Sequence, residues 1–297
     1  KYRPPKLDFL GLTFGGRVNL CNANCVYCFT NSNSITKQEM TDEEIIFLIN
    51  SLFGLGIKQL SIGGGEPFLR NLTKIISEVE KDINISITTN GTILDDEIIE
   101  CIKNRNVKIT ISLDSLNSQH MKKVRKGIDL SDVLNNIDKL VKFQDIRKNL
   151  SIRSTISTNN ITDLKELVDY CESKKIPRLK INSINAFGRG KRCVDIIPEF
   201  SEFINILEEI RDYSQNMTLD VELPIEKYLG HGSNICTLGR QSIYIDSTGN
   251  VYPCAFSEGS LLFGNVLKHQ FDSIKENFRL FNYRNITCEN CIIHRYE

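Results

Sequence analysis

Segments of strand type and of helix type alternate along most of this chain, and this alternation limits the folds that it can adopt. Short runs rich in Ile, Val, Thr and Leu, several of them bounded by Gly or Asn, predict β-strands. They lie at residues 12–19, 58–62, 83–88, 107–113, 151–157 and 179–184. Apolar residues at helical spacing predict helices between and after them. These segments lie at residues 45–53, 72–79, 95–102, 130–143, 164–171 and 200–213. The first of them follows Thr41-Asp-Glu-Glu44, which is the pattern of a capping box.

Repeated strand-then-helix units predict an α/β fold with parallel strands joined by right-handed crossovers. Six units are too few to close an eight-stranded barrel. We therefore expect a partial, TIM-like (β/α)6 barrel, open at one side, over residues 7–215. In barrels of this kind the chemistry is placed at the C-terminal ends of the strands. The residues that follow each predicted strand are therefore the first candidates for a site.

Composition excludes several classes of partner for this chain of 297 residues. Lys plus Arg and Asp plus Glu both number 37, so the net charge of zero favours neither nucleic acid nor an anionic membrane. There is no apolar run of membrane-spanning length, and no charged-then-apolar leader precedes the first motif. Seven of the ten cysteines fall into two metal-like groups, while Cys101 and Cys171 lie in helix-like segments. This usage indicates a reducing, cytoplasmic location rather than a disulfide-bonded secreted protein.

Three cysteines follow the first predicted strand closely, in the spacing C-x3-C-x2-C at Cys21, Cys25 and Cys28. Neighbours this close in sequence can form few disulfides, and three thiolates do not complete a tetrahedral metal site. Three ligands do suit a four-iron, four-sulfur cluster in which one iron has no protein ligand and is open for chemistry. A zinc knuckle and three unrelated buried cysteines are the alternatives.

With Tyr27 before the last cysteine, this triplet resembles the signature of the radical S-adenosylmethionine (radical SAM) enzymes. The resemblance implies a [4Fe-4S] cluster whose open iron chelates the amino and carboxylate groups of SAM. One electron from the cluster then cleaves the sulfonium bond, and the resulting 5′-deoxyadenosyl radical abstracts a hydrogen atom from the substrate. The resemblance also implies a partial barrel fold and an electron donor of the flavodoxin or ferredoxin type.

Two polar turns follow the second and third predicted strands. The first is Gly63-Gly64-Gly65-Glu66, in which the glycines let a ligand approach the backbone and the carboxylate suits a ligand ammonium group. A plain glycine-rich turn is the alternative. The run looks like the GGE motif of the family, which implies a contact with the SAM amino group. The second turn contains Thr89 and Asn90 and is similar to the TNG element of the family.

Further candidates lie at the ends of the later strands. Ser112 and Asp114 form a polar pair that suits a ribose or a substrate group, although either could cap a helix. Arg153 could pair with the SAM carboxylate as a fork-shaped donor. The resemblance implies that Arg125 faces the site and that Ile184, on the sixth strand, packs on adenine.

The last third of the chain, residues 216–297, has a different character and predicts a second domain. A strand, a Thr-Gly-Asn turn and a second strand predict a β-hairpin at residues 242–254. Four cysteines in this region could close a second metal site, for which a zinc ribbon is the rival: Cys236, Cys254, Cys288 and Cys291.

The spacing of these cysteines resembles the SPASM/Twitch extension of radical SAM enzymes, which implies at least one auxiliary [4Fe-4S] cluster. The full SPASM pattern continues with a cysteine where this chain ends, at Glu297. Either the extension is a shortened, Twitch-like one whose four cysteines serve a single cluster, or it continues beyond this sequence. We expect one auxiliary cluster.

We expect an enzyme that modifies a peptide or protein, for example by thioether crosslinking, epimerisation or oxidation, because an open-sided barrel admits a chain. A radical SAM enzyme acting on a sugar, a cofactor precursor or a porphyrin is the alternative, and a non-catalytic iron–sulfur or zinc scaffold is the third hypothesis. Cys193 could return a hydrogen atom to a substrate radical, with Arg192 favouring its thiolate. An ordinary buried or surface cysteine is the competing interpretation.

Overall fold

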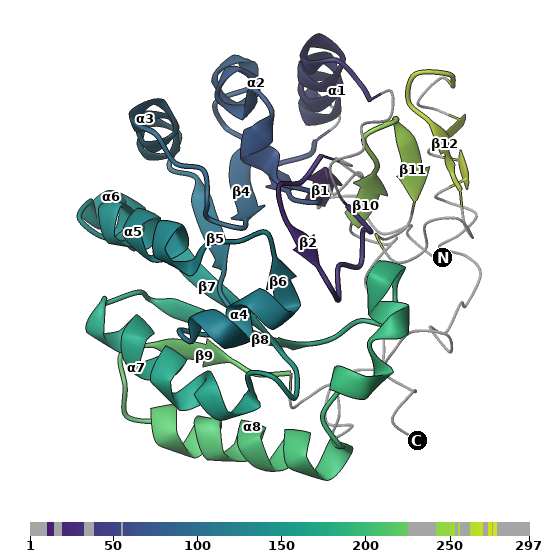
Figure 1. The fold of residues 1–297 in the computed structure, drawn as a ribbon. Helices are drawn as coiled ribbons and strands as arrows, with labels where there is room; N and C mark the ends of the chain where they lie inside the picture. Colours follow the sequence, from purple (N-terminus) through teal and green to yellow (C-terminus); the bar gives the residue numbers. More distant parts are fainter. Residues whose placement is uncertain are drawn as a thin grey trace, which may run out of the picture.

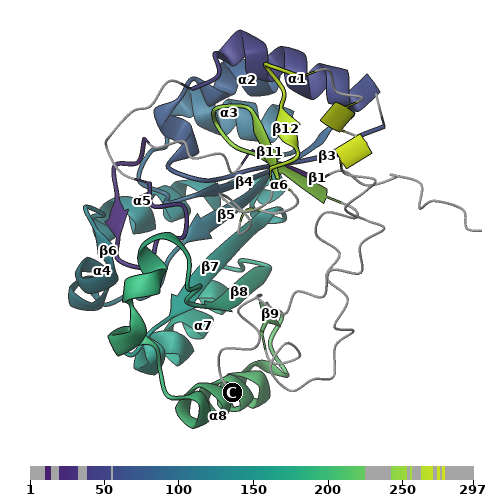
Figure 2. The same ribbon diagram turned by 90° about the vertical axis from the view of Figure 1, so that its right-hand side faces the viewer.

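The structure is a computed structural model, and the residues that it describes form an α/β partial barrel (Figure 1). They are residues 11–14, 20–32, 39–54, 56–224, 242–252, 255, 262–269, 273–274 and 276–277. One curved sheet forms the inner layer, and the larger helices lie along its outer side. Figure 2 shows the sheet from the side, with α1, α2 and α3 at one end and α7 and α8 at the other.

The predicted strands are all present and lie side by side in one parallel sheet. Their bounds are β1 Gly11–Phe14, β3 Gln59–Ile62, β4 Asn84–Thr89, β5 Lys108–Ser112, β7 Leu150–Ile156 and β8 Arg178–Ser183. Two further parallel strands extend this sheet: β9 (Asp220–Glu222) pairs with β8, and β10 (Ser242–Ile245) pairs with β1. The expected partial barrel is confirmed, and its sheet has a further parallel strand beyond the predicted one at each edge.

The predicted hairpin is also confirmed. β10 pairs in antiparallel fashion with β11 (Asn250–Tyr252), and β12 (Gly264–Asn265) pairs with β11. The carboxylate of Asp246 closes the turn by accepting hydrogen bonds from the backbone N–H groups of Thr248, at 2.9 Å, and Asn250, at 3.0 Å. Because β9 and β10 both belong to the barrel sheet, this sheet extends past residue 216, and the division into two domains stays a prediction.

The helices begin and end close to the predicted positions. They are α1 Asp42–Gly54, α2 Leu72–Glu78, α3 Asp96–Asn104, α5 Leu130–Leu140, α7 Leu164–Ser173 and α8 Phe200–Ser214. Two short helices were not predicted, α4 (Ser118–Val124) and α6 (Gln144–Arg147). The capping box of α1 is confirmed, because the Thr41 N–H donates to Glu44 Oε2 at 2.8 Å and the Glu44 N–H donates to Thr41 Oγ1 at 3.2 Å.

The two faces of the sheet differ in polarity. Along β4, Ile85 and Ile87 are buried in the core, whereas Ser86 and Thr88 on the opposite face are half-buried. The same alternation continues in β5 and β7, where Thr110 and Arg153 lie on the half-buried face. The helices therefore pack on an apolar outer face, and the inner face of the barrel is polar.

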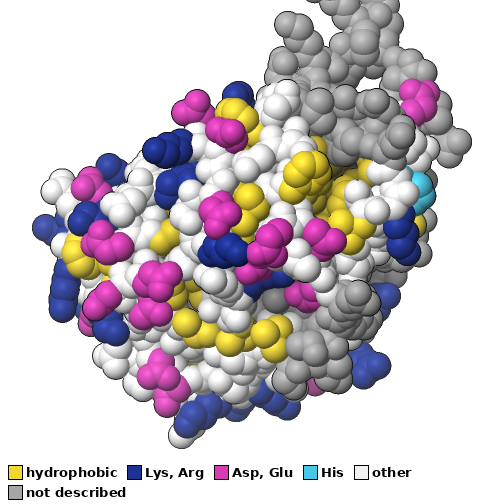
Figure 3. Space-filling view, turned by 90° about the horizontal axis from the view of Figure 1, so that it is seen from above, with side chains coloured by type: hydrophobic (Ala, Val, Ile, Leu, Met, Phe, Trp, Pro, Cys, Tyr) yellow, Lys and Arg dark blue, Asp and Glu magenta, His cyan; other side chains and the backbone are white. Residues whose placement is uncertain are grey.

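The outer surface mixes charges of both signs. Figure 3 shows acidic and basic side chains interspersed over the face seen from above, in keeping with the zero net charge of the chain. None of the helices in the described ranges is long and apolar enough to cross a membrane.

Candidate active site

The three cysteines of the triplet lie on one loop at the C-terminal ends of the strands. We call residues 20–32 the cysteine loop. Its thiols at Cys21, Cys25 and Cys28 are free and half-buried. Burial raises the pKa of Cys21 to about 11 and also raises the pKa of Cys25. Within the described part of the chain, no group of three His, Cys, Asp or Glu side chains lies close enough together to bind a single metal ion. A four-iron cluster offers each cysteine its own iron, and three free thiols on one loop fit such a cluster.

Glu66 holds the turns after β3 and β4 together. Its carboxylate is fully buried and accepts hydrogen bonds from Thr89 Oγ1 at 2.7 Å and from the backbone N–H groups of Asn90 at 2.7 Å and Phe68 at 3.2 Å. Burial raises the pKa of Glu66, and these three hydrogen bonds oppose that shift. The carboxylate thus supports the loop ends, and its contact with a ligand ammonium stays a prediction. Gly64 and Gly65 beside it are half-buried, and Gly63 is buried.

Both turns also contact the cysteine loop. The Glu66 N–H donates to the carbonyl oxygen of Leu20 at 3.0 Å. Asn90 Nδ2 donates to Asn22 Oδ1 at 2.7 Å, and Asn22 Nδ2 donates to Thr92 Oγ1 at 2.8 Å. The sequence did not predict the roles of Asn22 and Thr92, because nothing near either residue in the sequence indicates that their side chains pair.

Asp114 accepts hydrogen bonds from several parts of the site. Its fully buried carboxylate accepts from the Tyr27 hydroxyl, from Arg125 Nε at 2.8 Å and Nη2 at 3.3 Å, and from the Thr155 N–H at 2.9 Å. Although burial lowers it, the pKa of Arg125 is raised well above its usual range because the Asp114 carboxylate lies so close. The Arg125 guanidinium also lies 5.7 Å from the centre of the Tyr27 ring. Asp114 therefore anchors the cysteine loop to the end of β5, and the predicted ribose contact stays a prediction.

A short antiparallel ribbon supports the middle of the cysteine loop. β2 (Asn24–Cys25) pairs with β6 (Arg125–Lys126), so that Cys25 lies opposite Arg125. The Val26 N–H extends this pairing with a hydrogen bond of 2.9 Å to the Val124 carbonyl. Two-residue strands carry no periodicity, and the sequence could not predict this ribbon.

The remaining candidates lie near the same strand ends. Ser112 is buried and opposite Arg153 in the β5–β7 register, and Ile184 is buried after β8. Arg153 is half-buried, and its Nε has no hydrogen-bond partner among the described residues. A buried guanidinium donor without a partner fits an anionic ligand such as the SAM carboxylate.

Cys193 lies beneath the cysteine loop. It is 5% exposed, and its thiol donates to the Val26 carbonyl at 3.2 Å. Burial raises the pKa of the Cys193 thiol, with Asp195 adding to the shift, so the thiolate expected from Arg192 is not favoured. The expectation of a low pKa was wrong because it counted one charged neighbour and not the burial. The hydrogen-donor role stays a prediction, and a buried position gives it no support.

The second group of cysteines lies outside the described residues: Cys236, Cys254, Cys288 and Cys291. Their assignment as ligands of an auxiliary cluster stays a prediction.

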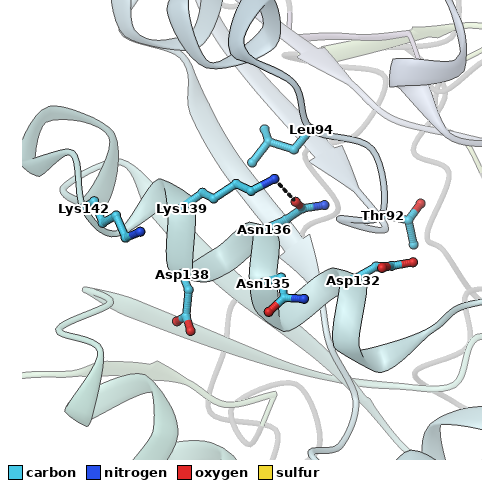
Figure 4. Close-up of a pocket in the computed structure, with 8 residues that line it drawn as sticks. All are labelled: Thr92, Leu94, Asp132, Asn135, Asn136, Asp138, Lys139 and Lys142. Carbon is cyan, nitrogen blue, oxygen red and sulfur yellow. Dashed lines mark hydrogen bonds between the residues drawn. The ribbon is translucent and has the colours of Figure 1, made fainter.

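A separate polar hollow lies on the outer side of the barrel, between α5 and the turn after β4 (Figure 4). Lys139 Nζ reaches Asn136 Oδ1 across it at 3.4 Å, and Asn136 Nδ2 donates to the Gly91 carbonyl at 2.9 Å. The side chains predicted to carry chemistry do not line this hollow. It is therefore distinct from the site at the strand ends.

Comparison with known proteins identifies the class to which this fold and site belong. The family model of the radical SAM superfamily matches residues 17–171, and that of the iron–sulfur cluster-binding (SPASM) domain matches residues 236–292. The chain belongs to the radical SAM superfamily and carries a SPASM domain. It is a radical SAM enzyme whose cofactors are SAM and [4Fe-4S] clusters.

Particular relatives fall into two functional groups. The chain is 30% identical over 206 residues to a probable GTP 3′,8-cyclase of Methanocaldococcus jannaschii, covering 67% of this chain and 61% of that protein. It is 25% identical over 283 residues to the sporulation killing factor maturation protein SkfB of Bacillus subtilis, covering 92% of this chain and 66% of SkfB. The crystal structure of Streptococcus suis SuiB bound to its precursor peptide SuiA shares the fold, with a TM-score of 0.74 and 18% identity. That match covers 92% of this chain and 66% of SuiB. The chain thus spans less than two thirds of the length of each of these proteins.

Proposed function

We propose that this enzyme cleaves SAM reductively at a cluster held by Cys21, Cys25 and Cys28 and modifies a peptide or protein substrate. The observation that carries the first part is that the ends of β3, β4 and β5 and the α4–β6 segment all contact one loop bearing three free, half-buried thiols. A cluster bound there, once reduced, supplies the electron that cleaves the sulfonium bond of SAM.

The residues of this chain position the reactants and keep water away. Asp114 and Glu66 are both fully buried and fix the cysteine loop and the turn after β4 through hydrogen bonds. The free donor of Arg153 is the proposed partner of the SAM carboxylate, and Ile184 is the proposed apolar contact of adenine. A site fixed in this way orients a bound substrate at little further cost on binding.

Two observations support a peptide as the substrate. SkfB, whose name describes the maturation of a killing factor, matches 92% of this chain, and SuiB, which has the same fold, was crystallised with a precursor peptide. The polar inner face of the open barrel gives an extended chain polar groups to bind, such as Thr88 and Thr110. GTP is the second candidate, because the cyclase relative has the higher identity, 30% over 206 residues against 25% for SkfB.

The test is SAM cleavage by anaerobically reconstituted, reduced protein. We expect 5′-deoxyadenosine and methionine to form, and a Cys25→Ala variant to form neither, while Cys101→Ala, outside the cysteine loop, retains the activity. Zinc bound at Cys21, Cys25 and Cys28, or a cluster there that never cleaves SAM, would refute the proposal.

A second experiment distinguishes the two substrates. Deuterated peptides encoded beside the gene, and deuterated GTP, are supplied separately, and deuterium is measured in 5′-deoxyadenosine. Transfer from the peptide supports peptide modification. Transfer from GTP alone would overturn it in favour of the small-molecule reaction.

A further inference from the structure

A turn after β8 packs against the cysteine loop and donates hydrogen bonds to its backbone. We call residues 188–193 the 188–193 turn; it includes the 3-10 helix η3 (Gly188–Arg192). The Arg189 N–H donates to the Cys28 carbonyl at 2.9 Å, and Arg189 Nε donates to the Cys25 carbonyl at 2.7 Å. Cys193 Sγ donates to the Val26 carbonyl, which lies between them. The turn therefore binds three carbonyl groups between the second cysteine of the triplet and the third, those of Cys25, Val26 and Cys28.

The backbones of the two segments approach too closely for a side chain at Gly188. A Cβ there, where φ is +54°, would lie 2.4 Å from the Phe29 carbonyl oxygen and 2.5 Å from that of Cys28. A Cβ on Gly190 would lie 2.0 Å from the carbonyl oxygen of Asn185, which precedes the turn. Glycine at 188 therefore allows the contact with the cysteine loop, and glycine at 190 allows the turn to fold back on Asn185.

The Arg189 side chain reaches beyond the triplet. Its Nη1 donates to the Ser32 carbonyl at 2.9 Å, so one guanidinium joins both ends of residues 25–32. Its Nη2 is buried without a hydrogen-bond partner among the described residues. The guanidinium therefore places a positive charge beside the backbone of Cys25.

We propose that Arg189 is a positioning residue that preforms the cysteine loop for its cluster, and that its charge favours the reduced cluster. This inference rests on the proposed assignment of Cys21, Cys25 and Cys28 as ligands. The planar guanidinium fork holds the Cys25 and Ser32 carbonyls in a fixed geometry, whereas the donors of a lysine ammonium all extend from a single atom. A positive charge near an iron–sulfur cluster stabilises its more negative, reduced state.

The first test measures the loop without any cluster. Hydrogen–deuterium exchange of the metal-free protein, followed by mass spectrometry, is compared for Arg189→Gln, Arg192→Gln and the wild type. Arg192 lies exposed in the same turn and gives the matched loss of charge. We expect peptides covering residues 20–32 to exchange on the order of tenfold faster in Arg189→Gln alone, since it loses hydrogen bonds from a charged donor. Equal exchange in the two variants would refute the positioning role.

The second test uses the reconstituted protein. We expect Arg189→Gln to lose iron to a chelator on the order of tenfold faster than Arg192→Gln, as is typical when the groups that support metal ligands are removed. An EPR-monitored redox titration should give a more negative midpoint potential for Arg189→Gln. Arg189→Lys should restore the potential but not the exchange protection. An unchanged potential in Arg189→Gln would refute the charge effect.

A glycine pair tests the same contact without changing any charge. Gly188→Ala and Gly56→Ala both place alanine at positive φ, but a Cβ on Gly56 meets no atom within 4 Å. Faster exchange of residues 20–32 is expected in Gly188→Ala only. If the wild type binds no cluster, the ligand assignment fails, while the exchange results still decide whether the turn holds the loop.

Discussion

At the scale of single residues, the site depends most on a carboxylate that reaches no solvent. Asp114 joins the ends of β5 and β7 to the cysteine loop through Tyr27, Arg125 and Thr155. A buried ion pair contributes little net stability when it is intact, but removal of one partner leaves the other charge buried and unpaired. The sequence correctly predicted that Asp114 lies at the end of its strand, and it predicted a ribose or a substrate group as its partner. The protein groups that bind the Asp114 carboxylate lie far apart in sequence, so the sequence did not predict them.

Replacing that carboxylate should be costly. We expect Asp114→Asn to lower the free energy of unfolding by about 3–5 kcal/mol, because the Arg125 guanidinium loses its buried counter-charge. Urea denaturation of the metal-free protein measures the change. Asp145→Asn removes an exposed pair with Lys148 and should change stability by less than about 0.5 kcal/mol. Equal effects in the two variants would contradict this account.

At the scale of elements, local patterns predicted most of the barrel, and long-range pairings escaped prediction. The capping box of α1, the six helices and the six inner strands follow from periodicity that a short window contains. β2 and β6 have two residues each, and β9 has three, so they carry too little pattern to predict. The contacts of Arg189 with carbonyl groups remote in sequence likewise left no local signal.

Hydrogen bonds between Glu172 on α7 and the residues just before β9 give a pH-dependent prediction. Glu172 at the end of α7 accepts hydrogen bonds from the Thr218 N–H at 3.1 Å and the Leu219 N–H at 2.9 Å, and the bond from the Thr218 N–H is the main cause of its lowered pKa. Because the pKa of Glu172 is lower in the folded protein than in the unfolded chain, its carboxylate stabilises the fold. This stabilisation is complete at a pH above the unfolded-state pKa, near 4.5, and is lost as the pH falls through the folded-state pKa.

We therefore expect Glu172→Gln to be less stable than the wild type at pH 7, with the difference shrinking below pH 4.5. Thermal unfolding followed by circular dichroism across this range measures it. Glu166→Gln on the same helix is the control, because Glu166 is exposed. A difference that does not vary with pH would show that the carboxylate charge is not what holds β9.

At the scale of the whole molecule, the metal content reports on the second cysteine group. If these cysteines bind one auxiliary cluster, the reconstituted chain should hold about eight irons, and Cys254→Ala about four. Cys171→Ala, on the buried face of α7, should leave the iron content unchanged. Zinc in place of the missing irons would support a zinc ribbon instead.

The place of β1 in the sheet has a consequence for how the protein is made. This strand pairs on one side with β3 and on the other with β10, which follows every other parallel strand of the sheet along the chain. Until β10 emerges from the ribosome, the backbone amides and carbonyls along that side of β1 have no strand to bind. The sheet is therefore completed only after β3 to β9 have been made, and until then β1 presents an open β-edge.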